Sequence, residues 1–421
     1  MLAPRTYLSS LELIGIKLGL DQIHALLAAL DHPDRAYRAI VIAGTNGKGS
    51  VSAMLERGLR SAGYRTGRYT SPHLVRLEER FAVNGVDIEA EALEAAIART
   101  ARAAASLPAP PTFFEATTAV GLDLFRDAAI DVALLEVGLG GRLDATNAVA
   151  AEASVITAID FDHQQYLGHT IEAIAGEKAG VIKPETFCVL ARNPPAVVGV
   201  VEAQCRAVNA DLVLAANDID VRTTFADGRA RISMRTPRRQ HDDLTLGLRG
   251  RHQIDNAITA VRALDELDAR GRFTVGAADV RAAVEDVTWP ARLETARVHG
   301  HDVLIDGAHN AAGAAALAAY LREVYGRPVP VVLGVLGDKA LEAVVSRIAT
   351  AASHVVCTTP ASPRAAAPAD LAAIVRRVAP GVGVETVDPP VAAIEAAARH
   401  GSPVVVAGSL YLAGEVRAHV S

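Results

Sequence analysis

The sequence holds few of the residue types that mark several large classes of protein. Only 3 of its 421 residues are cysteines, and none of them forms a Cys-x-x-Cys pair. We therefore expect neither a disulfide framework nor a zinc site, and a reducing compartment. The formal net charge is −6 and no long basic run occurs, which argues against nucleic acid as the main partner. Local positive patches for an anionic substrate remain compatible with this balance.

Long apolar runs are missing as well. Glu12, Lys17 and Asp21 interrupt the apolar positions of the N-terminal segment, so it resembles neither a signal peptide nor a membrane-spanning helix. No later stretch reaches the roughly 18 uncharged apolar residues that a spanning helix needs. We therefore expect a soluble, cytoplasmic protein without a membrane partner.

What the sequence does hold is a long alternation of strand-like and helical patterns. The chain is 50% hydrophobic and longer than one core usually supports, so we expect two domains. Strands and helices alternate as far as residue 208, and the stretch 217–249 indicates antiparallel strands before two more helices. After Trp289-Pro290-Ala291-Arg292 a second series begins with a strand at 303–306. We predict two doubly wound α/β domains, 1–290 and 291–421, with the active site in the cleft between them.

A glycine-rich stretch, Gly44-Thr45-Asn46-Gly47-Lys48-Gly49-Ser50, separates a buried-strand pattern from a helical one. Such a turn presents backbone N–H groups and the positive end of a helix dipole, which suits a phosphate. The usual Gly-x4-Gly-Lys-Ser/Thr pattern is only partly met, because Ile42 occupies the first glycine position and Gly49 follows the lysine. An ordinary turn would leave Lys48 unexplained. We predict a variant phosphate loop for a nucleotide triphosphate, with Thr45 to Ser50 in contact with it.

Other polar residues of the first domain also follow strand patterns. Glu136 closes the apolar stretch 131–136 before a glycine-rich segment, which is typical of a carboxylate that directs magnesium, although a solvated acid is the plainer alternative. His163 follows the strand pattern at 154–158 and could reach the same cleft, but histidine is an unusual magnesium ligand. Lys178 ends a helical pattern and, on this evidence alone, only complements the helix dipole.

Residues nearer the C-terminus could complete such a site. Asn256 lies one turn inside a helical pattern and could hydrogen-bond a base, although a polar first turn explains it equally well. Arg292, at the domain joint, could neutralise phosphate charge when the domains close. Asp306 and His309 lie where a strand pattern meets a helical one. They could bind ribose, act as acid or base, or orient phosphate, and Asn310 could cap the helix.

Taken in order, these stretches resemble the folylpolyglutamate synthase and dihydrofolate synthase family, relatives of the Mur peptide ligases. Each motif is weak alone, but the ordered set spans nearly the whole chain. The stretches that carry the resemblance are Gly44–Ser50, Ser71-Pro72-His73-Leu74, Glu136–Asn147, Asp162-His163 with Leu167-Gly168, Glu177–Gly180, His252-Gln253 with Asn256, Trp289–Glu294 and Asp306–Asn310.

The resemblance implies a monomeric ligase with a P-loop domain like the central domain of Mur ligases and a Rossmann-like C-terminal domain. In its reaction a substrate carboxylate takes the γ-phosphoryl group of ATP, and the amine of L-glutamate attacks the acyl phosphate. The acceptor would be dihydropteroate or a reduced folate. Because bacterial members often use both, we expect a bifunctional enzyme.

The resemblance also implies roles for single residues. One or two magnesium ions are implied, with Ser71, Glu136 and His163 as ligands. Lys178 would carry a carbamate, formed from a neutral amine and CO2, that holds a second ion through water; this requires burial that lowers the pKa of the lysine.

Further roles follow in the same way. Lys48 would hold phosphates, and His309 would occupy an active-site position. Adenine, phosphate and ribose contacts are implied for Asn256, Arg292 and Asp306, in that order. Gly337 stands where a lysine is common in the family, which implies one positive charge fewer in the second domain.

Three other functions compete with this interpretation. A Mur-type ligase for a nucleotide-linked muramyl substrate would carry a further domain before its phosphate loop, which here begins at Gly44. A regulatory NTPase that switches a partner would leave Asp306 and His309 without a task. A non-enzymatic binding protein would need neither Glu136 nor Lys48. We expect pterin contacts around residues 113–118, although their periodicity suits a core helix equally well.

Overall fold

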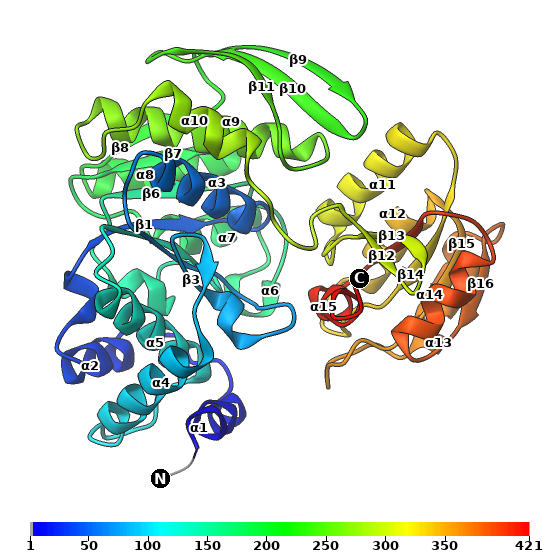
Figure 1. Ribbon diagram of the computed structural model, residues 1–421, viewed down its shortest axis with the longest axis horizontal. Helices are drawn as coiled ribbons and strands as arrows, with labels where there is room; N and C mark the ends of the chain where they lie inside the picture. The colour runs from blue at the N-terminus through cyan, green and yellow to red at the C-terminus, as the bar shows by residue number, and fades with distance from the viewer. Residues whose placement is uncertain (1–2, 421) are drawn as a thin grey trace.

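The computed structural model describes residues 3–420, which form two groups of elements, each built around a large sheet (Figure 1). The first large sheet has eight strands and the second has six, and a separate three-stranded sheet accompanies the first group. Helices pack on both faces of each large sheet. The predicted fold class, two doubly wound α/β domains, is confirmed.

The first sheet is largely parallel and places its phosphate-loop strand near the middle. In sheet order the strands are β4 (Val86–Asp87), β3 (Phe81–Val83), β2 (Thr66–Tyr69), β5 (Val132–Glu136), β1 (Arg38–Ala43), β6 (Ala153–Ile156), β7 (Phe187–Leu190) and β8 (Asp211–Leu214). Residues 39–43 of β1 are fully buried, because a central strand covered on both faces is apolar throughout. The β3–β4 hairpin turns at Asn84-Gly85, both with positive φ, a residue pair that favours tight hairpin turns.

Two layers of helices cover the first sheet. One face carries α1 (Pro4–Leu11), α2 (Asp21–Ala29), α4 (Ala90–Ala104), α5 (Phe113–Asp127), the single turn α6 (Gln164–Leu167), α7 (Ile171–Ala179) and α8 (Pro195–Ala207). The other face carries α3 (Lys48–Ser61), α9 (His252–Ala269) and α10 (Ala277–Glu285). Within residues 3–420, no helix has both the length and the apolar character needed to cross a bilayer.

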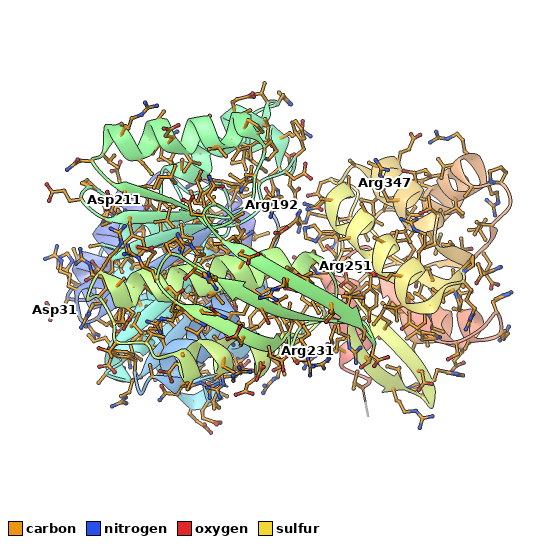
Figure 2. All side chains as sticks on the ribbon, turned by 90° about the horizontal axis from the view of Figure 1, so that it is seen from above. Asp31, Arg192, Asp211, Arg231, Arg251 and Arg347 are labelled. Atoms are coloured by element: carbon orange, nitrogen blue, oxygen red, sulfur yellow. The ribbon has the colours of Figure 1, made fainter. Side chains whose placement is uncertain are left out.

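The three-stranded sheet lies over α9 and α10 and extends towards the second group (Figures 1 and 2). It consists of β9 (Asp220–Ala226), β10 (Arg229–Arg235) and β11 (Gln240–Thr245), all antiparallel. The antiparallel strands predicted in 217–249 are present, and β9 and β10 are joined by a turn at Asp227-Gly228 with positive φ at both residues. Phe225 packs against the cores of both groups, so this sheet links the two halves of the molecule.

The second large sheet is also mainly parallel. In sheet order its strands are β12 (Glu294–Val298), β13 (His301–Ile305), β17 (Val404–Ala407), β14 (Val329–Leu333), β15 (Ala352–Cys357) and β16 (Gly383–Thr386). One face carries α11 (Ala311–Tyr325), α12 (Leu341–Ala349) and α13 (Pro368–Val378). The other face carries α14 (Pro390–Ala398) and α15 (Leu410–Arg417).

Two strands, β8 and β12, were not predicted from the sequence, and both lie at sheet edges. The residues of β8 and β12 are partly exposed, so neither strand shows the continuous apolar run that marks a buried one. The prediction that the second domain starts with a strand at 303–306 is therefore wrong: β12 precedes it and pairs with β13 as an antiparallel hairpin. The phosphate-loop helix begins at Lys48, three residues earlier than its apolar pattern.

Candidate active site

The residues that the sequence singled out come together in one cavity of about 340 Å³, at the ends of strands from both large sheets. They reach it from the loops after β1, β2, β5, β6 and β13, from the last turn of α7 and from the first turns of α9. The predicted residues that line this cavity are Thr45, Asn46, Gly47, Lys48, Gly49, Ser50, Ser71, Glu136, His163, Lys178, Asn256, Arg292, Asp306 and His309.

The loop between β1 and α3 is shaped by close approaches that only glycine permits. At Gly44, where φ is 143°, a Cβ would lie 1.9 Å from the Thr157 hydroxyl oxygen. At Gly47, with φ of 94°, a Cβ would lie 2.4 Å from Asn256 Oδ1. The amides of Thr45 and Asn46 donate to the Ala158 carbonyl over 2.9 and 3.1 Å. These contacts fix the loop against β6 and α9, with the N-terminus of α3 facing the cavity.

Two lysines lie against the same carbonyl in this loop. Lys48 Nζ is 3.2 Å from the carbonyl oxygens of both Gly44 and Thr45, and Lys178 Nζ donates to the Gly44 carbonyl over 2.9 Å. Burial, with a smaller contribution from Lys48, lowers the pKa of Lys178 to about 7. About half of the Lys178 side chains are therefore neutral near pH 7. This reactive amine is what burial was expected to produce.

Ser71, Glu136 and His163 supply a mixed set of donor atoms. Glu136 is 6% exposed, and its Oε2 accepts from the Ser71 amide over 3.3 Å. Burial raises the pKa of Glu136, whereas Lys48 opposes this. Burial lowers the pKa of His163 to about 4, so its ring is neutral at pH 7 and has a free lone pair. A hydroxyl, a carboxylate and a neutral imidazole together suit a divalent cation.

A chain of amide side chains connects α9 to the phosphate loop. Asn256 Nδ2 donates to Gln253 Oε1 over 2.8 Å, and Gln253 Nε2 donates to the Ser50 hydroxyl over 3.3 Å. Gln253 is fully buried and Asn256 is 8% exposed. Because Asn256 also lies against Gly47, its amide is held in one place beside the loop. The sequence analysis named Gln253 only as part of a motif and gave it no role; its contact with Asn256 shows that it orients that amide.

Asp306 holds the joint between the two halves. Its carboxylate oxygens accept from the amides of Leu293 and Ala308, both over 2.9 Å, and burial raises its pKa. Ala291 and Leu293 both have left-handed backbone conformations, with φ of 54° and 50°. Arg292 lies between them, and its guanidinium donates to the Ala291 carbonyl over 2.9 Å.

Polar contacts cross the cleft between the halves. Lys339 Nζ lies 2.6 Å from Asp162 Oδ1, and His309 Nε2 lies 3.6 Å from Asp162 Oδ2. Asn310, which caps α11 as predicted, also donates to Asn46 Oδ1 over 3.0 Å. Burial alone would raise the pKa of Asp162. The neighbouring His309, His163 and Lys339 outweigh this effect and hold the pKa well below its usual range.

Lys339 is the main residue that the sequence analysis missed. It follows Gly337, where the resemblance implied a lost positive charge, and it brings an ammonium group into the cleft. The sequence did hold a signal for Lys339. Residues 336–339 follow the strand pattern at 330–335, and the carboxyl ends of parallel strands meet at the edge of the sheet where active sites lie.

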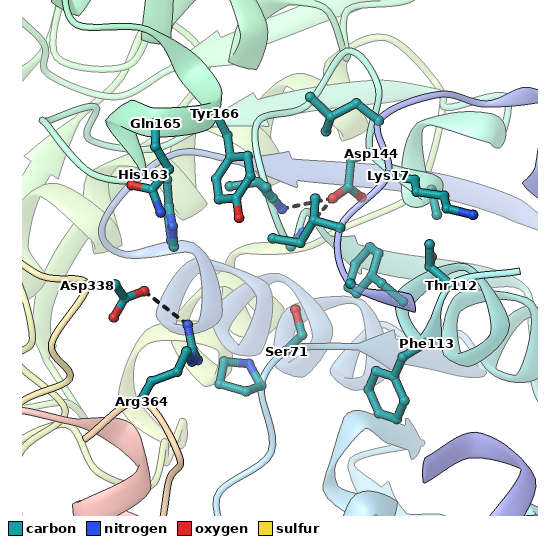
Figure 3. A pocket seen from close by; sticks show the side chains of 18 of the residues that line it. Lys17, Ser71, Thr112, Phe113, Asp144, His163, Gln165, Tyr166, Asp338 and Arg364 are labelled. Atoms are coloured by element: carbon teal, nitrogen blue, oxygen red, sulfur yellow. Dashed lines mark hydrogen bonds and ion pairs between the residues drawn. The ribbon is translucent and has the colours of Figure 1, made fainter. Parts of the chain in front are cut away.

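A second cavity of about 500 Å³ adjoins the first and shares Ser71, His163 and His309 with it. Figure 3 shows side chains from both halves around this cavity, among them Lys17, Phe113, Tyr166 and Arg364. Arg364 pairs with Asp338 over 3.0 Å. Phe113, Phe114 and Glu115 line the cavity, whereas Thr117 and Thr118 bond to the buried Tyr69 hydroxyl. Residues 113–115 thus line a cavity, whereas residues 117 and 118 belong to the core side of the helix, and the predicted pterin contacts stay a prediction.

The chain matches two protein-family models and many known proteins. The Mur ligase middle domain matches residues 42–264, and the Mur ligase glutamate ligase domain matches residues 291–410. The dihydrofolate synthase/folylpolyglutamate synthase of Mycobacterium tuberculosis is 40% identical over 82% of this chain and 75% of its own length. The protein of the same name from Bacillus subtilis is 33% identical over 96% of this chain and 95% of its own.

Solved structures agree with this relationship. Mycobacterium tuberculosis folylpolyglutamate synthase complexed with ADP and AMPPCP has a TM-score of 0.90 at 35% identity, over 99% of this chain and 98% of that chain. Escherichia coli FolC in complex with DHPP and ADP has a TM-score of 0.88 at 29% identity, over 99% and 97%. With matches to both Mur ligase models and relatives above 30% identity along nearly its whole length, the chain belongs to the dihydrofolate synthase/folylpolyglutamate synthase family of Mur ligases.

Proposed function

We propose that the protein joins L-glutamate to a pteridine-bearing carboxylate, with ATP as the source of energy and an acyl phosphate as intermediate. The observation that carries the proposal is the pair of adjoining cavities, which share Ser71, His163 and His309. A phosphate held by the loop in the smaller cavity would face a carboxylate held in the larger one. The relatives' names support two acceptors, dihydropteroate and a reduced folate.

The smaller cavity is assigned to ATP. Residues 45–50, with Lys48, hold the phosphates through backbone amides and the ammonium group. Asn256 is assigned to contact the adenine, Arg292 to contact a phosphate and Asp306 to contact the ribose. The ADP and AMPPCP complexes of the Mycobacterium tuberculosis relative support a nucleotide in this place.

Ser71, Glu136 and His163 are assigned to a magnesium ion, since their donor atoms fit such a cation. When bound, the ion neutralises charge on the phosphates. We further propose that the neutral amine of Lys178 attacks CO2, forming an N–C bond and releasing one proton. The resulting carbamate replaces a positive charge by a negative one and adds oxygen ligands for a second magnesium ion through water.

The larger cavity is assigned to the acceptor, with Phe113 and Phe114 against the pteridine ring. An acceptor carboxylate oxygen attacks the γ-phosphorus, and the bond to ADP breaks. The glutamate nitrogen then attacks the acyl carbon, and inorganic phosphate leaves. The complex of the Escherichia coli relative with DHPP and ADP supports separate sites for a second ligand and a nucleotide.

We assign to His309 the role of a base, which accepts the proton that the glutamate amine loses. Its Nδ1 lies 2.8 Å from the Gly307 carbonyl, which can only accept, so the neutral ring carries its proton on Nδ1. Nε2 is then free to accept a proton, and Asp162 would stabilise the imidazolium.

We place the boundary between the ATP-binding domain and the glutamate ligase domain at residues 290 and 291, and we propose a cytoplasmic monomer. The net charge of −6 supports small molecules, with neither nucleic acid nor membrane, as its partners.

The test is ADP release by the purified protein with ATP, magnesium and glutamate, in the presence of dihydropteroate, of tetrahydrofolate or of neither. We expect release only with an acceptor, and a product heavier by one glutamyl residue. Turnover of both acceptors would establish bifunctionality. Equal release without acceptor would refute the ligase and favour a regulatory NTPase.

A further inference from the structure

Three potential metal ligands gather on the second large sheet, on strands away from the cleft. His354 lies on β15, Glu385 lies on the neighbouring edge strand β16, and His400 follows α14. One ligand atom from each lies within 4.8 Å of the other two. In Figure 1, β16 lies at the side of the molecule farthest from the first group of elements.

The register of the two strands explains how the side chains meet. His354 pairs with Gly383, and Val356 pairs with Glu385. Because alternate residues of a strand share a face, His354 and Glu385 point to the same side of the sheet as Val356, which packs with α14. A Cβ at Gly383 would lie 2.4 Å from His354 Nδ1, so the glycine provides the space that the imidazole occupies.

In the part of the chain that the structure describes, the polar groups of the cluster have only one another as side-chain partners. The rings of His354 and His400 stack with centroids 3.6 Å apart and planes 5° from parallel. Their Nε2 atoms lie 3.4 and 3.6 Å from the same oxygen, Glu385 Oε1. The Nε2 of His354 is buried without a well-aligned hydrogen bond within residues 3–420. In the same part of the chain, Glu385 has no arginine or lysine within ion-pair distance.

We propose that His354, Glu385 and His400 bind a divalent transition-metal ion of the zinc type, with water as the fourth ligand. Two imidazole nitrogens and one carboxylate oxygen are the ligands that zinc accepts, at about 2.0–2.2 Å. Both rings must tilt from their stacked positions to direct their lone pairs at one ion. The His400 side chain, 39% exposed, has room to do so.

The ligand atoms of this site differ from those of the site assigned to magnesium, and they favour a different metal. Magnesium prefers an octahedron of oxygen ligands and binds poorly where two of three ligands are imidazoles. A bound ion would tie the edge strand β16 to β15 and to the end of α14, outside the catalytic cleft.

The test is a titration of the chelator-treated full chain with Zn²⁺ by calorimetry, in buffer that contains Mg²⁺ and ADP to occupy the cleft. Co²⁺ is the second probe, since its visible spectrum reports tetrahedral geometry. We expect the wild type to bind one equivalent more than His354→Ala or His400→Ala, and Glu385→Gln to bind at least tenfold more weakly. The matched control is His299→Ala, which removes a half-exposed histidine beside Glu395 and should bind like the wild type.

Thermal unfolding gives an independent measurement. Zn²⁺ should raise the unfolding temperature of the wild type and of His299→Ala, but not that of His400→Ala, and ligase activity should not change. If His354→Ala fails to fold, the result for His400→Ala is decisive, because the His400 side chain is 39% exposed and contributes less to the core. Equal Zn²⁺ stoichiometry and affinity in the wild type and His400→Ala would refute the site.

Discussion

The two sides of the cleft differ in what holds their polar groups in place. In the first half, Lys48, Lys178 and Glu136 are bonded to backbone groups of that same half. In the second half, Lys339 and Asn310 are bonded to side chains of the first. The first half therefore presents a preformed site, whereas Lys339 and Asn310 of the second half reach their partners only when the two halves lie together. Such a division is typical of enzymes whose domains close around a substrate.

We expect the largest loss of activity from a substitution in the first half, where the site is preformed. Lys48→Ala removes the ammonium that we assign to the phosphates, and we expect kcat/KM to fall by about 10³-fold, as for loss of other preorganised charges. Steady-state kinetics and nucleotide binding by calorimetry would measure this. The control is Lys183→Met, since Lys183 instead bonds to the Asn147 carbonyl over 2.6 Å. Similar losses in both variants would contradict the assignment.

Lys178 should show a dependence on pH and CO2. Because its pKa is lowered to about 7 and only the neutral amine forms a carbamate, activity should rise as the pH rises through 7 and should require bicarbonate in CO2-depleted buffer. Lys178→Met should lose about 10²-fold in kcat and show neither dependence. A bicarbonate effect that persists in Lys178→Met would exclude the carbamate.

Substitutions that weaken contacts across the cleft should reduce kcat less than substitutions of the preformed groups in the first half. Asp162→Asn weakens the contacts with Lys339 and His309, and we expect roughly a tenfold loss of kcat. X-ray scattering should show a more open average shape. The comparison is Glu323→Gln, which removes a more exposed pair with Arg251 at 2.6 Å; such pairs contribute little. An equal effect of both variants would show that Asp162 has no special role in closure.

The acceptor cavity allows the two halves to be compared directly. Phe113→Ala, in the first half, removes a ring that lines the cavity, and we expect KM for the pteridine substrate to rise about tenfold, as for loss of one buried apolar contact. Tyr411→Ala, in the second half, removes a ring that is 38% exposed and should have a smaller effect. If Tyr411→Ala raised KM more, the pteridine would lie nearer the second half.

The smallest effect concerns stability. Burial lowers the pKa of His252 to about 4, so the unfolded state binds a proton between pH 6.5 and 4 that the folded state does not. The free energy of unfolding should therefore decrease as the pH falls through this window. Urea unfolding at pH 7.5 and 5 should show a smaller decrease for His252→Asn than for the wild type, whereas His299→Asn should behave like the wild type.

Most of the fold and the composition of the first half of the site could be predicted from sequence. Strands such as β1 are continuous apolar runs, and the residues that follow them gather at one sheet edge by geometry alone. Edge strands such as β8 and β12 were missed because exposed residues interrupt their patterns. Lys339 was missed and Gln253 was given no role because their partners, Asp162 and Ser50, lie far away in the chain. The strand pattern places Lys339 at the sheet edge but does not identify the residue with which it pairs.

The left-handed residues at the joint have a mechanical consequence. Ala291 and Leu293 hold conformations that cost on the order of 1 kcal/mol each for side chains with a Cβ. Asp306, through the Leu293 amide, is one of the groups that keep this joint bent, and it is also the residue assigned to the ribose. The carboxylate assigned to the ribose therefore also supports the backbone that connects the two halves, so the nucleotide site and the domain joint share one residue.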